Sequence, residues 1–531
     1  MFITLERKEK TEMGLNNVYN FKNPVKHFLN IDNLIFPADI GTFAIDKLVW
    51  TEPFGFRIHK DNDKYRTLKM PNILNFVAAY YHYKDLPEFE DVQSMDWDHK
   101  RLSANIDTGD FTSGEYDFQL EEDFNNLCIY DNLIRLDVKE YYGRIYTHNI
   151  DFCNHDERYL SNMNCGATNG LLMGNYLSLY FAERNLAEIS HSLENHFIQN
   201  EIDCVFSYFS DDFYFFCNKE SNEMIIAIFD KVLEEYDLER SDKKEIWTYE
   251  SFNNHNLVAR YWKKLVAHCN IRFNSEKDDN KLYFINQMVY RMSKLDDDKL
   301  KKIFVNNVFK IRYFRELPLE KFQVKEYDYH QLCFLLKFSP ESMLYAIDRF
   351  AGMEAFEKQK LHRFFQIRYK ESLTKSYNEE QLYYFYAISM FEFDDILEQY
   401  KELVSKSNNQ ILISYYLKRN LFGQAEIDFL KNLFDEKYWF QNYHLILYCP
   451  DLLANIEDSI EKYLIPKKVL LPLCNKQSKL IKRTSYMEFY KANLEGGKAI
   501  IRDIPSVKET IIEYLELRME ESEEAFEDDD E

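Results

Sequence analysis

The chain has 531 residues, of which 46% are hydrophobic, 16% aromatic and 29% charged, so it is long enough for two or three folded domains and too hydrophobic to be intrinsically disordered. Its 66 Lys and Arg against 90 Asp and Glu give a net charge of −24, which argues against a broad basic surface that grips duplex nucleic acid. No apolar run reaches signal-peptide or membrane-spanning length and the nine cysteines form no CxxC pair, so we expect a cytoplasmic protein with reduced thiols and no membrane partner.

The first element with a distinctive charge pattern is a predicted β-hairpin at residues 56–71, FRIHKDNDKYRTLKMP. A polar turn separates its two arms. The cations of the hairpin include Arg57, Lys60, Lys64 and Arg66. Either it is an exposed charged hairpin without a further role, or its cations bind an anionic ligand.

Three predicted strand segments have carboxylates at their ends. The segment YDNLIRLDV, residues 130–138, ends near Asp137, and the strands CVFSYF and FYFFC flank Asp211 and Asp212. A simple turn is one interpretation, because Ser and Asp favour turns. If the strands lie side by side, the three carboxylates raise one another's pKa unless a cation neutralises them. Such oxygen ligands suit Mg²⁺ or Mn²⁺, so Asp137, Asp211 and Asp212 are the predicted metal ligands and catalytic residues.

Glycine is concentrated in the first half of the chain. Nine of the thirteen glycines precede residue 175, and Gly166, Gly170 and Gly174 lie just before a predicted helix, YLSLYFAERNLAEI. Glycine lets the backbone adopt unusual angles and approach a ligand closely, which makes Gly170 and Gly174 candidate binding residues. Further along, YDLERSDKKE contains Lys244 in a polar segment that is otherwise typical of a solvated loop.

The second half of the chain is predicted to be helical. Apolar residues recur every three or four positions from about residue 290 onward, for example in 378–406 and 424–448, without a clean repeat length. We therefore predict an α+β domain at 1–285 and a HEAT-like or irregular helical bundle at 286–518. The last thirteen residues, MEESEEAFEDDDE, hold nine acids and no base, so 519–531 are predicted to be a disordered acidic tail.

The motifs in the first half resemble a known family. Asp137 with Tyr142, then GLLMGNYLS at 170–178, then YFSDD at 208–212, resemble in order and spacing the palm motifs A, B and C of reverse transcriptases. The phrases YYGRIYTH and TNGLLMGN look most like the bacterial abortive-infection branch, and the helical second half is similar to its AbiK-like members. The resemblance covers roughly residues 50–250 and implies a reverse-transcriptase fold of fingers and palm.

This resemblance implies roles for individual residues. Asp137 and Asp211 would be the main metal ligands, with Asp212 an auxiliary acid beside them. Tyr142 matches the steric-gate position that presses against the nucleotide sugar, although a tyrosine beside a strand end is also an ordinary core residue. The nucleotide-binding residues implied by the family are Lys60, Arg66, Tyr142, Gly170, Gly174 and Lys244. Of these, Lys60 and Arg66 would clamp the triphosphate and Lys244 would approach the departing pyrophosphate.

One departure from the family pattern bears on the reaction. The usual Pro-Gln of motif B is Leu172-Met173 here, so the amide that helps to position template and nucleotide is missing. The retron elements NAxxH and VTG are also absent. The resemblance thus implies an antiphage-defence DNA polymerase that is protein-primed and template-independent. It would use dNTPs and two Mg²⁺ (or Mn²⁺) and form a homo-oligomer. Its product would be single-stranded DNA, either free or attached covalently to the protein. The alternatives are a non-catalytic palm-fold scaffold that senses phage components and a templated retron-like enzyme.

Overall fold

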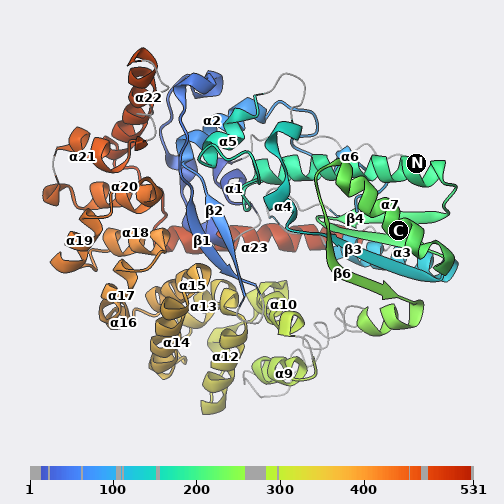
Figure 1. The fold of residues 1–531 in the computed structure, drawn as a ribbon. Helices are drawn as coiled ribbons and strands as arrows, with labels where there is room; N and C mark the ends of the chain where they lie inside the picture. The colour runs from blue at the N-terminus through green and yellow to red at the C-terminus, as the bar shows by residue number, and fades with distance from the viewer. Residues whose placement is uncertain are drawn as a thin grey trace.

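The chain forms a mixed α+β structure with a helical C-terminal region, as predicted at this level (Figure 1). The computed structural model describes residues 14–21, 24–60, 64–102, 109, 113–150, 156–256, 283–295, 298–453, 455–467 and 476–527. The statements below refer to these residues.

A four-stranded antiparallel sheet carries the predicted acidic residues. Its strands lie in the order β4-β5-β3-β6. They are β3 (Asn132–Val138), β4 (Cys204–Phe209), β5 (Asp212–Cys217) and β6 (Arg240–Trp247). The first three match the predicted strands. β6 was not predicted, because its sequence RSDKKEIW is polar, as suits a half-exposed strand at the edge of a sheet.

One face of this sheet is apolar and packs against helices. Ile134 and Leu136 of β3 and Phe213 and Phe215 of β5 are fully buried there. The ring of Phe229 from helix α7 (Asn222–Glu235) lies 5.1 Å from that of Phe213 and 5.6 Å from that of Phe215, centroid to centroid. Because side chains alternate along a strand, the residues between these point to the other face.

The second face of the sheet is only partly covered. Helix α3 packs over one end of it through a small apolar cluster. The cluster consists of Phe124, Leu127, Leu133, Phe216 and Phe252. At the other end Arg135, Asp137, Asp212 and Tyr214 are partly exposed. The sheet therefore presents polar side chains at the end where β3 finishes and β5 begins.

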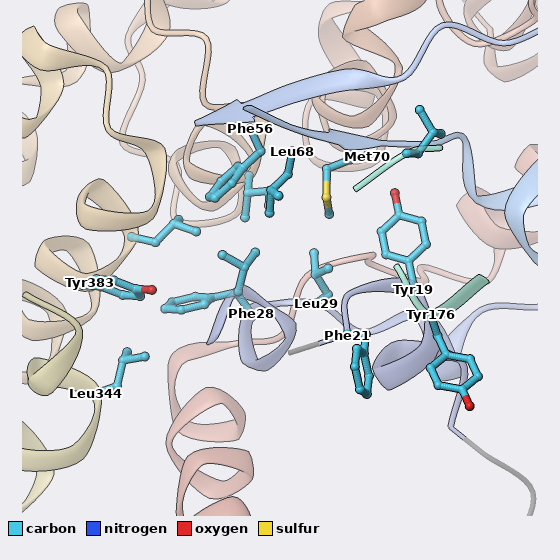
Figure 2. Packing of buried hydrophobic residues seen from close by; sticks show 14 of the residues in the cluster. Tyr19, Phe21, Phe28, Leu29, Phe56, Leu68, Met70, Tyr176, Leu344 and Tyr383 are labelled. Atoms are coloured by element: carbon cyan, nitrogen blue, oxygen red, sulfur yellow. The ribbon is translucent and has the colours of Figure 1, made fainter. Parts of the chain in front are cut away.

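The predicted hairpin forms a separate two-stranded sheet. β1 (Phe54–His59) pairs with β2 (Tyr65–Met70), from Phe54 opposite Met70 to His59 opposite Tyr65. Phe56, Leu68 and Met70 are buried and point into the core of the protein (Figure 2). Residues 66, 68 and 70 share a face of β2, so Arg66 continues this inner face beyond the core.

The α-helices of the first half surround the two sheets. They are α1 (Leu15–Tyr19), α2 (Ile73–Tyr83), α3 (Ser113–Ile129), α4 (Tyr141–Arg144), α5 (Arg158–Met163), α6 (Tyr176–Gln199) and α7 (Asn222–Glu235). The predicted helix after the glycines is α6, and it continues for ten residues beyond the predicted segment.

The second half is a bundle of helices. They are α9 (Tyr283–Met292), α10 (Asp298–Lys310), α11 (Arg312–Glu316), α12 (Glu326–Phe338), α13 (Met343–Ala351), α14 (His362–Lys375), α15 (Asn378–Met390), α16 (Asp394–Gln399), α17 (Lys401–Ser405), α18 (Gln410–Lys418), α19 (Gln424–Lys431), α20 (Trp439–Tyr448), α21 (Ile456–Tyr463), α22 (Lys476–Glu495) and α23 (Ile504–Glu527). The predicted helical segment 378–406 is divided into α15, α16 and α17. The break after α15 contains Glu392, whose φ of +61° no α-helix accommodates.

The predicted boundary at residue 285 does not separate two cores. One buried apolar cluster runs from the N-terminal segment through the β1–β2 hairpin to the C-terminal helices. Figure 2 shows Phe28 beside Tyr383 of the helical region, with Leu344 close by and Phe56 of the hairpin on the other side of Phe28. Backbone pairing joins the ends of the chain as well, because the Asn30 amide donates to the Ile500 carbonyl at 2.7 Å.

The predicted disordered tail is helical over most of its length. α23 extends to Glu527, so residues 519–527 belong to a helix, and residues 528–531 lie outside the described part. Glu, Met and Ala favour helix when a helix already precedes them, which outweighs the repulsion among the acids. In Figure 1 this helix crosses from the helical region toward the sheet. Among the described helices, none is long and apolar enough to cross a bilayer.

Candidate active site

The structure brings Asp137, Asp211 and Asp212 together at one end of the sheet; we call these three residues the acidic site. Asp137 lies directly opposite Asp212 in the pairing of β3 with β5. The Val138 amide donates to the Asp211 carbonyl at 2.9 Å, which holds the turn against β3. The turn itself is only Ser210 and Asp211, and Ser210 adopts a φ of +54°. A tight hairpin therefore presents the acids, as the sequence predicts.

Proximity of the three carboxylates affects the protonation of Asp137. The pKa of Asp137 is raised to about 6, mainly by burial and also by the charges of Asp211 and Asp212, while the charges of Arg135 and Lys243 act to lower this pKa. A carboxylate that is both partly buried and next to other acids is stabilised by a cation. No hydrogen bond or ion pair joins the side chain of Asp137 or Asp211 to another residue within the described ranges.

Asp212 differs from the other two acids because it already has a cationic partner. The Arg135 guanidinium donates from Nε to Asp212 Oδ1 at 3.0 Å and from Nη2 to Asp212 Oδ2 at 2.6 Å. Arg135 also donates to Glu245 of β6 at 3.2 Å. Asp212 is thus held in a two-pronged ion pair on the open face of the sheet.

The three acids differ in how well they suit a divalent metal ion. Over the residues that the structure describes, no group of three or more His, Cys, Asp or Glu side chains is arranged to hold a metal ion. Asp137 and Asp211 suit such an ion, because they are neighbouring carboxylates and no basic group within the described ranges forms an ion pair with either of them. Asp212 fits less well, because both of its oxygens accept from Arg135.

Tyr142 lies close to the acidic site. It belongs to the short helix α4 that follows β3, and its side chain is half-buried. Burial raises the pKa of Tyr142 well above its ordinary value; the charges of Glu183 and Asp211 add to this, and Arg66 opposes it. The hydroxyl of Tyr142 therefore lies within the electrostatic influence of Asp211 from the sheet, Glu183 from α6 and Arg66 from the hairpin.

Gly170 and Gly174 allow the loop before α6 to pass close to its neighbours. Gly170 has a φ of +88°, and a Cβ there would lie 3.1 Å from the Gly143 carbonyl oxygen of α4. Gly174 has a φ of +113°, and its Cβ would lie 3.4 Å from Leu68 of β2. The loop thus joins α4 to the hairpin, and only glycine fits these backbone angles without strain.

The cations of the hairpin occupy different positions. Arg66 lies on the inner face of β2, near Tyr142. Lys60 follows the end of β1 and is exposed, with its amide donating to the Lys64 carbonyl at 2.9 Å. The guanidinium of Arg57 lies over the ring of Tyr65, 4.5 Å from its centroid. Arg66 is therefore the hairpin cation whose charge acts on Tyr142.

Lys244 lies on the other side of the sheet from the acidic site. In the pairing of β3 with β6 it is opposite the buried Leu136, and its Nζ lies 3.7 Å from Glu223 of α7. The adjacent Lys243 shares a face with Glu245, 3.0 Å away, and its charge acts on Asp137. The structure thus places Lys243, rather than the predicted Lys244, beside the acids.

Sequence reasoning also missed a buried ion pair beneath the site. Lys100 Nζ lies 2.8 Å from Glu183 Oε2, and both side chains are nearly inaccessible to solvent. Lys100 donates in addition to the Val92 carbonyl at 2.7 Å. Arg135 was missed too, although its position two residues before Asp137 on a strand places both on one face.

Comparisons with known proteins identify no family. No family model and no curated protein matches the chain. Among solved structures, the chain is similar to telomerase from Candida albicans in complex with a fragment of telomeric RNA, at 11% identity and a TM-score of 0.29. The match covers 72% of this chain and 66% of the telomerase chain, just under two thirds of that protein.

Proposed function

We propose that this chain is a nucleotidyltransferase of the reverse-transcriptase type that adds dNTPs to a hydroxyl group. The observation that carries the proposal is the meeting of Asp137 with the Asp211 turn at the open end of the sheet, where the charges of Asp211 and Arg66 both act on Tyr142. Two strand-borne carboxylates, a cation and an aromatic side chain in one place are the groups needed to hold a triphosphate and its sugar.

Each residue around the acidic site would have its own role in nucleotide binding or catalysis. Asp137 and Asp211 would hold Mg²⁺ or Mn²⁺, which would supply charge neutralisation at the phosphate and activation of the attacking hydroxyl. Arg66 would bind phosphate oxygens with its planar guanidinium. Tyr142 would pack against the sugar, where a 2′-hydroxyl has no room. Gly170 and Gly174 would let the loop backbone approach the nucleotide.

The finer description follows from the motif resemblance. An abortive-infection enzyme of the AbiK-like type would make DNA without a template, starting from a hydroxyl of the protein itself, and would act in antiphage defence. Leu172-Met173 in place of Pro-Gln supports synthesis without a template. The net charge of −24 supports the same idea, because a template duplex binds best to a basic surface.

Incorporation of labelled dNTPs by the purified chain tests the proposal. With Mg²⁺ or Mn²⁺ present, Asp211→Asn and Asp137→Asn should each lower the label incorporated by at least about 100-fold. Asp237→Asn is the matched control, since Asp237 is exposed and has a φ of +57°, which Asn tolerates. Equal label in the wild type and Asp211→Asn would refute a polymerase role.

The nature of the product tests the finer description. Protease digestion should change the mobility of the labelled DNA if the DNA is attached to the protein, and should leave it unchanged if it is not. RNase treatment of the preparation should not reduce synthesis. A structured RNA that co-purifies and is needed for synthesis would favour a templated retron-like enzyme instead.

A further inference from the structure

The ion pair between Arg135 and Asp212 changes which acids can act as metal ligands. Both oxygens of Asp212 accept from the Arg135 guanidinium, at 3.0 and 2.6 Å. A carboxylate that ligates a cation needs an oxygen lone pair directed at that cation. In Asp212, the lone pairs that face Arg135 already accept hydrogen bonds from its guanidinium. The guanidinium also carries a positive charge, which repels a metal cation placed near it.

The position of Arg135 is itself fixed from several sides. Its Nη1 donates to Glu245 of β6 at 3.2 Å, and its guanidinium lies 5.7 Å from the centroid of the Tyr214 ring. The side chains of Arg135, Asp212 and Glu245 are each only 22 to 28% exposed, so solvent screens the ion pairs incompletely. Arg135, a residue of β3, thus connects Asp212 of β5 with Glu245 of β6 through its guanidinium.

Asp137 and Asp211 are not held in this way. Asp137 lies across from Asp212 and two residues from Arg135, yet within the described ranges no basic group forms an ion pair with it or with Asp211. The three acids therefore fall into two kinds: two that are open to a cation and one that a guanidinium already neutralises.

We propose that Arg135 is a positioning residue that keeps Asp212 out of the metal-binding set, so that Asp137 and Asp211 alone hold the divalent cation. The inference rests on the proposed function, because it concerns the metal of that same site. Asp212 would then act by fixing the start of β5 against β3, which sets the position of the Asp211 turn.

Binding of Mn²⁺ to the purified full-length chain, followed by the loss of the free-ion electron paramagnetic resonance signal, tests this inference without using activity. Asp211→Asn and Asp137→Asn should each weaken Mn²⁺ binding by at least about 10-fold. The decisive variant is the double change Arg135→Gln with Asp212→Asn, which removes one positive and one negative charge together. It should bind Mn²⁺ within about 2-fold of the wild type, since no ligand is lost and the local charge is unchanged.

The single change Arg135→Gln gives an opposite expectation. Releasing Asp212 provides a third carboxylate, so Mn²⁺ binding should tighten by about 10-fold. Lys243→Gln is the matched control, because it removes a nearby positive charge without releasing a carboxylate, and it should tighten binding only about 2-fold. If the double variant does not fold, as judged by loss of the wild-type melting transition, Arg135→Lys tests whether Arg135 restrains Asp212. It keeps the charge and loses the two-pronged contact, so it should still tighten binding.

The possible failures are distinguishable. If the double variant weakens Mn²⁺ binding as much as Asp211→Asn, Asp212 is a ligand and this inference is wrong, while the proposed function stands. If Arg135→Lys leaves Mn²⁺ affinity unchanged, Arg135 does not restrain Asp212 and the inference is again wrong. If the wild type binds no Mn²⁺ that depends on Asp137 and Asp211, the proposed function and this inference both fall.

Discussion

Glu379 of helix α15 links the stability of the protein to pH through the β1–β2 hairpin. Its Oε1 accepts the His59 amide of β1 at 2.7 Å, next to the Arg57 amide, which donates to Asn378 Oδ1 at 2.7 Å. Burial raises the pKa of Glu379 to about 8, against an ordinary value of 4.5. The His59 amide and the charge of Lys302 lower this pKa, while the charges of Glu380 and Glu341 raise it.

The sign of the pH effect follows from this shift. A group with a raised pKa in the folded state stabilises the fold below its unfolded pKa, and this contribution is lost as pH rises through the folded pKa. The loss for Glu379 falls between pH 4.5 and about pH 8. At about 1.4 kcal/mol per pH unit it amounts to at most about 5 kcal/mol. Glu379→Gln removes the titration but keeps an oxygen that accepts from the His59 amide.

Thermal unfolding at pH 5, 7 and 9 measures the effect. The Tm of Glu379→Gln should equal that of the wild type at pH 5 and exceed it by up to about 4 °C at pH 9. Glu402→Gln is the control, since Glu402 is fully exposed and its Tm difference from the wild type should stay constant from pH 7 to pH 9. A Tm difference for Glu379→Gln that does not change with pH, or that is largest at pH 5, would refute the reasoning.

Three further predictions concern the surroundings of the site. Lys100→Met should lower the free energy of unfolding by about 3 kcal/mol, because it leaves Glu183 buried without its ion pair, and urea unfolding should show that adding Glu183→Gln recovers most of the loss. Gly170→Ala should cost about 1–2 kcal/mol in urea unfolding through its φ of +88° and the contact with the Gly143 carbonyl, whereas Gly143→Ala, whose Cβ would meet nothing within 4 Å, should cost less than about 0.5 kcal/mol. A fragment of residues 1–285 should show no cooperative melting transition, since its buried residues share one core with the C-terminal helices; a sharp transition in the fragment would contradict this.

The arrangement of the acids could be predicted because it depends on local pattern. The segment from Phe206 to Cys217 has two short apolar strands around Ser-Asp-Asp, and only a tight hairpin satisfies both strands and turn. With Asp137 at the end of a strand, pairing of that strand with the hairpin brings the carboxylates together. The sequence alone also allows a turn without function.

The choice between Lys243 and Lys244 could not be predicted in the same way. The pairing of β3 with β6 shifts between Leu136 and Val138, so that Leu136 is opposite Lys244 and Val138 is opposite Arg240. Which lysine faces the acids is decided by the register itself, because pairing Leu136 with Lys243 instead of Lys244 would exchange the two faces of β6. No feature of the sequence RSDKKEIW fixes this register, so which of two neighbouring lysines faces Asp137 depends on tertiary structure.

The extent of the core could not be predicted from local sequence pattern either. The hydroxyl of Tyr486 donates to Asn75 Oδ1 at 2.6 Å across 411 residues of sequence, and Asn72 Nδ2 donates to the Tyr490 hydroxyl at 2.7 Å. Hydrophobic periodicity identifies α22 as a helix with a buried face, but it does not say that this face covers α2 of the first half. The change from mixed to helical composition therefore marks a change of secondary structure, while the buried apolar cluster is shared between the two parts of the chain.

This shared core determines how the hairpin reaches the acidic site. The outer edge of β1 forms hydrogen bonds with Asn378 and Glu379 at the start of α15, so the helical region holds the hairpin by its backbone. Arg66 lies on the neighbouring strand, and its charge acts on Tyr142. We therefore expect a perturbation of α15 to act on the hairpin that carries Arg66 without touching Asp137 or Asp211. The helical half thus contributes to the candidate site, because it binds the backbone of the hairpin that carries the group proposed to bind phosphate.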